Sequence, residues 1–183
     1  MFRSIITLAA MTLILGFGFE PLAAQVEPIP DEMRVRQLPR QQLSGPRFGF
    51  TTFTGQTADD RRTHLEKGPI MSQFGWQFET QIVSTTTGNQ ALMEWVALVG
   101  GAEQNDLTFS LAWLAGYRMP NGLELGVGPN VSYNDTTETT TTSMVLAAGA
   151  TLPFGEIYVP LNMAVAFAEG GPRITTLIGW IIG

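Results

Sequence analysis

The chain contains no cysteine and carries little positive charge. Without cysteine no disulfide can form, and lipid attachment through an N-terminal cysteine is excluded. Ten Lys and Arg residues stand against 16 Asp and Glu residues, which gives a net charge of −6. This balance argues against a nucleic-acid partner, because phosphates select basic surfaces. The uncharged apolar run at 5–19 is short for a helix that crosses a bilayer.

That apolar run has the features of an export signal. Arg3 supplies the positive charge before it, and Leu22, Ala23 and Ala24 offer the small residues that a signal peptidase requires. We therefore predict a signal peptide at 1–24, cleaved before Gln25, and a protein that leaves the cytoplasm. An uncleaved anchor helix is the alternative.

The next segment, 25–44, is rich in proline and glutamine and has no sustained hydrophobic period. We predict a flexible N-terminal arm here, followed by one domain from 45 to 183.

From 45 onward, polar and apolar residues alternate in eight segments. The clearest is 73–82, where Phe74, Trp76 and Phe78 lie on the face opposite Gln77 and Glu79. A period of two is typical of a β-strand with one apolar and one polar face. The eight predicted strands are 46–53, 70–84, 90–99, 107–118, 123–133, 142–152, 157–167 and 173–182. No segment has a clear period of 3.6, so we expect almost no helix after the signal peptide.

The apolar faces either pack inward, as in a soluble barrel or sandwich, or face lipid. Uniform strand lengths, aromatic residues near strand ends and the alternation of tight turns with longer loops favour lipid. The opposite faces are rich in glycine and alanine, which suit the narrow interior of an eight-stranded barrel. The predicted fold is an all-β, eight-stranded antiparallel up-and-down transmembrane β-barrel.

In this architecture, 45–183 resembles the small eight-stranded outer-membrane barrels of the OmpA-transmembrane and OmpX type. The resemblance implies a porin-like barrel of the Gram-negative cell envelope, located in the bacterial outer membrane, in contact with its lipid and folded by the barrel-assembly machinery. It also implies a structural or surface-interaction role. The C-terminus departs from this resemblance. Such barrels commonly end in an aromatic residue, whereas here three residues follow Trp180.

Six charged residues fall on the predicted inner face. The turn at 120–122 should pair Arg118 with Glu124, and the turn at 85–88 should set Glu79 opposite Glu94. Two carboxylates so placed repel each other, so either one is protonated or an arginine bridges them. Such pairs can also perform acid–base work or hold a metal, but we favour a structural role. The predicted lumen ionic network comprises Arg47, Glu79, Glu94, Arg118, Glu124 and Arg173.

The sole histidine, His64, lies in a charged segment with no recognisable nucleophile motif. We predict a solvated surface loop that includes Asp59, Asp60, Arg61, Arg62, His64 and Glu66. No catalytic, cofactor-binding or metal-binding residue is predicted, and the protein is expected not to be an enzyme. Two alternatives stay open: a lipid-modifying outer-membrane barrel enzyme that uses His64, and a soluble exported lipocalin-like binding barrel.

Overall fold

The computed structural model describes residues 43–182. The predicted signal peptide, residues 25–42 of the predicted arm and Gly183 lie outside the described residues. The described part is almost entirely β-structure. Its strands are β1 (Gly45–Phe53), β2 (Ile70–Ser84), β3 (Gln90–Gly100), β4 (Thr108–Arg118), β5 (Leu123–Asn134), β6 (Thr139–Phe154), β7 (Ile157–Phe167), β8 (Arg173–Gly179) and β9 (Ile181–Ile182).

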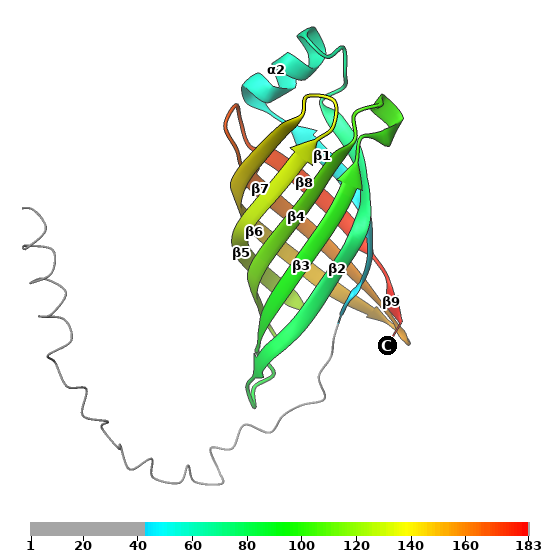
Figure 1. The fold of residues 1–183 in the computed structure, drawn as a ribbon. Helices are drawn as coiled ribbons and strands as arrows, with labels where there is room; N and C mark the ends of the chain where they lie inside the picture. The colour runs from blue at the N-terminus through cyan, green and yellow to red at the C-terminus, as the bar shows by residue number, and fades with distance from the viewer. Residues whose placement is uncertain (1–42, 183) are drawn as a thin grey trace, which may run out of the picture. The chain divides into compact units, whose positions relative to one another are not determined.

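The strands form a closed barrel (Figure 1). Each of β1 to β8 pairs antiparallel with the next in sequence, and the pairing of β1 with β8 closes the sheet. After Trp180, β9 continues the line of β8 and pairs with Ile157 and Tyr158 at the start of β7. Over residues 43–182, the predicted eight-stranded antiparallel up-and-down barrel is therefore confirmed.

The two ends of the barrel differ, and we name them by their connections. At the turn end, short connections join β2 to β3, β4 to β5 and β6 to β7, and β1 begins there. The loop end carries the β1–β2, β3–β4, β5–β6 and β7–β8 connections. The β5–β6 connection is shorter than predicted, because Thr139, Thr140 and Thr141 also belong to β6 and pair with β5.

A helix at the loop end overturns the expectation of almost no helix. The helix α2 (Gly55–Thr63) lies in the β1–β2 connection, and the short 3₁₀ helix η2 (Ala102–Gln104) lies in the β3–β4 connection. Only Ala58 and Arg61 of α2 are buried, so no apolar stripe marked this helix in the sequence. Within the described residues, neither helix has the length and apolar character needed to cross a bilayer.

The apolar face of the alternating segments lies on the outside of the barrel. Phe74, Trp76 and Phe78 are 47%, 43% and 54% exposed, whereas Gln77 and Glu79 are each only 3% exposed. The same separation holds around the barrel, so the predicted assignment of residues to two opposite faces is confirmed. In β2 the alternation continues through a bulge, because Ile82 and Val83 both face outward before Ser84 turns in.

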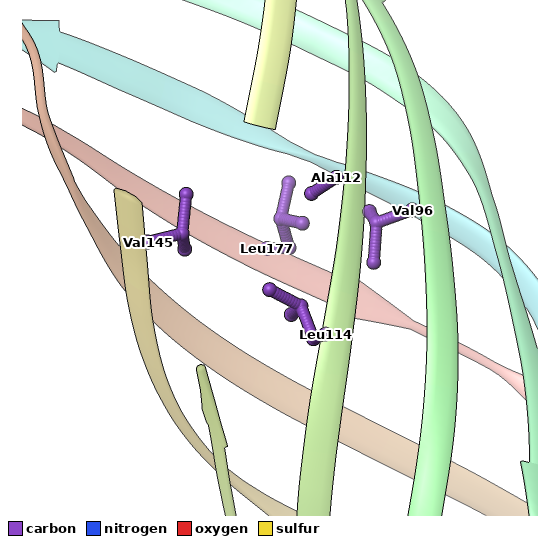
Figure 2. Packing of buried hydrophobic residues seen from close by; sticks show 5 residues of the cluster. All are labelled: Val96, Ala112, Leu114, Val145 and Leu177. Carbon is purple, nitrogen blue, oxygen red and sulfur yellow. The ribbon is translucent and has the colours of Figure 1, made fainter. Parts of the chain in front are cut away.

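The middle of the lumen is apolar, although the inner faces are polar nearer both ends. Figure 2 shows side chains from four strands that project toward one another there. The members of this inner apolar cluster are Val96, Ala112, Leu114, Val145 and Leu177. A second cluster of Phe53, Ala58 and Met71 packs α2 against the loop end. The lumen is thus divided into a polar layer near the turn end, an apolar middle and a capped loop end.

Candidate functional site

The lumen near the turn end contains a cluster of buried charges contributed by five successive strands. Cross-strand pairing sets Glu79 opposite Glu94 and Arg118 opposite Glu124, as predicted. The Glu79–Glu94 pairing has a different origin from the one expected. The β2–β3 connection has one more residue than predicted, and the bulge in β2 restores the predicted register. We call this set the carboxylate–arginine cluster: Arg47, Glu79, Glu94, Arg118 and Glu124, each at most 6% exposed.

Arg118 is the centre of the cluster. Its Nε donates to Glu124 Oε1 at 2.7 Å and its Nη1 to Glu79 Oε1 at 2.8 Å. Its Nη2 donates to the second Glu79 oxygen, and Nη1 also reaches Gln90 Oε1 at 3.2 Å. The guanidinium therefore bridges two carboxylates from different strands, a geometry that its planar set of donors favours.

Arg47 connects to the cluster through an amide. Its Nε donates to Gln77 Oε1 at 3.0 Å, and Gln77 Nε2 donates to Glu94 Oε2 at the same distance. The remaining donors of Arg47 bind backbone oxygens of Leu43, Gly45 and Pro46. Arg47 thus holds the chain where it enters the barrel. Gln77 was placed on the same face as Glu79 from the sequence, but it was not included in the predicted ionic network.

The three glutamates also offer a geometry in which a cation could be bound. One carboxylate oxygen from each of Glu79, Glu94 and Glu124 lies within 4.8 Å of the others. Arg118 already occupies two of these carboxylates, however, and Thr151 Oγ1 donates to Glu124 at 2.8 Å. A metal ion would have to displace the guanidinium, so the arrangement as it stands is an ionic network.

Arg173 does not belong to this network, which corrects the prediction. It lies at the loop end of β8, where Nη1 donates to Ser132 Oγ at 2.9 Å and the guanidinium carbon lies 5.7 Å from the centre of the Phe53 ring. Its inward orientation was predicted from the alternation of side chains along the strand. This alternation does not report the height of a residue along the barrel, and Arg173 lies at the opposite end from Arg118.

One residue of the predicted surface loop, Arg61, is buried instead of exposed. Its side chain is buried and forms an ion pair with Asp106, with 2.7 Å between Nη1 and Oδ2. Its other nitrogens donate to Gly68 O and Gln104 Oε1. These bonds tie α2 to the β3–β4 connection. The remaining predicted loop residues are exposed: Asp59, Asp60, Arg62, His64 and Glu66.

Asp106 is fully buried and was not singled out from the sequence. Burial raises the pKa of its carboxyl, but the hydrogen bonds from Asn134 and Arg61 and the positive charges of Arg61 and Lys67 outweigh burial, so its pKa lies below the ordinary value. Lys67 also donates to the backbone oxygens of Gln104 and Asn105 at 2.7 and 2.8 Å. Thr108 faces inward at the start of β4, and Asp106 lies two residues before it, so the alternation of β4 extended backward would have placed Asp106 inside.

His64 lies on the outer surface of the loop end. Its Nε2 is 3.9 Å from Asp60 Oδ1, and both side chains are more than half exposed. Within residues 43–182 no serine or threonine side chain is hydrogen-bonded to His64. Asp60 lies in α2 and His64 is the C-cap residue of this helix, so the pair is a local surface contact one helical turn apart.

A cavity of about 90 Å³ remains inside the barrel, between the carboxylate–arginine cluster and the loop end. The lumen is therefore not completely filled by side chains. Half of the residues that line the cavity are apolar, and Glu94, Asn162 and Arg173 are among the polar residues. We compared the chain with protein-family models, curated proteins and solved structures, and none of the three comparisons gives a match.

Proposed function

We propose that this chain is a bacterial outer-membrane β-barrel protein that acts without catalysis, in a structural or surface-interaction role. One observation carries the proposal. The charged residues that lie within strands β1 to β9 all face the lumen, and the outward positions of these strands carry none. A water-facing barrel would have the opposite pattern.

The size of the apolar outer surface supports a lipid environment. Thirty-one large hydrophobic side chains are exposed, and they come from every wall of the barrel. The largest apolar patch on a soluble monomer is about 300–600 Å². A continuous belt around a barrel exceeds this area, and in water it would lead to aggregation. In lipid the same surface has no such cost.

The height of the belt also fits a bilayer. Strand β4 has 11 residues, as do β3 and β7. At about 3.3 Å per residue and a tilt of about 40°, such a strand spans roughly 28 Å, which matches the apolar thickness of an outer membrane. Tyr117 and Trp180 lie outside near the turn end, and Tyr133 and Phe167 lie outside near the loop end. Aromatic residues at both borders are typical of membrane barrels.

The lumen supports a role without transport through an open pore. The carboxylate–arginine cluster crosses the interior near the turn end, and α2 with its Arg61–Asp106 pair covers the loop end. An eight-stranded barrel has room for little more than its own side chains. The expected partners are outer-membrane lipid and, during folding, the barrel-assembly machinery.

Envelope fractionation followed by gel electrophoresis of heated and unheated samples tests the proposal. We expect the protein in the outer-membrane fraction, with a mobility that changes on heating because the closed barrel resists detergent until it is boiled. Recovery in the soluble periplasm, without a heat-dependent mobility, would refute the membrane assignment and favour the soluble binding barrel. Altered lipid A in cells that produce the protein, lost on His64→Ala, would favour the enzyme alternative.

A further inference from the structure

The internal cavity has a wall of mixed character. Val96, Leu114, Val145 and Leu177 give it an apolar side in the middle of the barrel. Polar side chains line it as well, and Arg173 approaches it from the loop end. A purely structural void in a barrel would be lined by apolar groups alone or filled by water that satisfies every polar atom.

Two residues that line the cavity each carry a buried polar atom that has no hydrogen-bond partner within residues 43–182. These atoms are the Nε of Arg173 and the Oδ1 of Asn162. Most buried polar atoms in folded proteins are paired, so two orphan atoms on one cavity need a partner that the cavity itself can hold.

The charge of Arg173 is also unbalanced. Its only side-chain hydrogen bond within residues 43–182 goes to the neutral hydroxyl of Ser132, and none of the described carboxylates lies within ion-pair distance. The other arginine near Phe53, Arg61, is neutralised by Asp106. Arg173 is partly buried, and a guanidinium withdrawn from water is costly unless an anion compensates it.

We propose that this cavity binds a short-chain monocarboxylate, with the carboxylate on Arg173 and the apolar body against Val145 and Leu177. A guanidinium binds a carboxylate through two parallel hydrogen bonds, and the Nε of Arg173 has no partner within residues 43–182. Glu94 lines the cavity on the side of the turn end, whereas Arg173 approaches it from the loop end, so the anionic group is oriented toward Arg173.

The volume limits the ligand to a small molecule. A cavity of about 150 Å³ accommodates benzene, which has six non-hydrogen atoms, so about 90 Å³ accommodates a molecule of about four non-hydrogen atoms. Acetate has this size, and it combines a carboxylate with an apolar methyl group. The site does not depend on where the barrel resides, so this proposal goes beyond the function proposed above.

Calorimetric titration of the folded chain in a zwitterionic detergent tests the proposal, with acetate as the probe. Ethanol and ethylammonium are matched in length and lack the negative charge. We expect saturable binding of acetate and none of ethylammonium. Equal binding of ethanol and acetate would show a cavity without an anion site, and no binding of acetate would show a cavity that holds only water. Either result overturns the proposal.

Substitutions locate the site. Arg173→Gln should weaken acetate binding by about tenfold or more, since it removes a charge-assisted pair, and Arg173→Lys should retain part of the affinity. Ala164→Leu should abolish binding by filling the cavity. Arg62→Gln is the matched control, because it removes an exposed arginine outside the lumen and should leave binding unchanged. Heat-dependent mobility identifies the folded variants, and unchanged binding in folded Arg173→Gln would refute the site even if Ala164→Leu fails to fold.

Discussion

Replacement of Arg118 by methionine probes the centre of the carboxylate–arginine cluster. Methionine preserves much of the side-chain volume but removes the four hydrogen bonds that Arg118 donates to Glu79, Glu124 and Gln90. The two glutamates then remain buried without a bridging cation. We expect Arg118→Met to unfold the barrel far more easily than any exposed charge replacement.

The magnitude follows from the contacts. Breaking a buried ion pair by removal of one partner typically costs about 3–5 kcal/mol, because the other charge stays desolvated. Arg118 pairs with two carboxylates, and each of the three charged partners is at most 6% exposed. We therefore expect the free energy of unfolding to fall by about 3–5 kcal/mol. Most of that loss is the penalty of the uncompensated carboxylates, so the triple variant with Glu79→Gln and Glu124→Gln should recover a large part of it.

Equilibrium unfolding in guanidinium chloride, followed by tryptophan fluorescence in lipid vesicles, measures these differences. The control is Arg62→Gln, which breaks an exposed contact of 3.6 Å with Asp59 and should change stability by less than about 0.5 kcal/mol. The reasoning is refuted if Arg118→Met lies within about 1 kcal/mol of the unmodified protein, or if the triple variant is no more stable than Arg118→Met alone.

Three further predictions address the outer face, the strand packing and the loop-end cap. Val127→Arg on the outward face of β5 should lower stability in vesicles by about 2–4 kcal/mol, because it places a charge in lipid, and unchanged stability in vesicles would contradict the membrane assignment. Gly128→Ala should clearly lower the denaturant concentration at the unfolding midpoint, because a Cβ there would lie 1.9 Å from the backbone oxygen of Trp113. Gly126→Ala is the control, because its Cβ would meet no atom closer than 3.5 Å, and it should be nearly neutral. The pKa of Asp106 is lowered in the folded state, so its stabilising contribution is complete above the ordinary value of about 4 and is lost as the pH falls through the lower folded pKa. Hydrogen exchange in α2 should therefore accelerate in that acidic range, and Asp106→Asn should remove this pH dependence.

The alternation of residues predicted the walls of the barrel well, because the face to which a side chain points is a local property of an extended chain. It placed Phe74 outside and Glu79 inside without knowledge of the neighbouring strands. Turn positions then predicted the pairing of Arg118 with Glu124, since a short hairpin sets its own register. The α2 helix was missed for the converse reason: its buried face is made by Ala58 and Arg61, and the burial of a charged residue leaves no hydrophobic period.

By itself, the sequence determined the eight barrel strands, the face of most strand residues and the register of the β4–β5 hairpin. These properties depend on residues that are close together in the chain. Only the tertiary structure decided which inward charges meet. Arg118 reaches Glu79 across 39 positions and Arg61 reaches Asp106 across 45, while Arg173 lies far from the cluster that its parity suggested. Closure of the barrel sets these distances, because it brings the strands to fixed heights and stagger around one lumen.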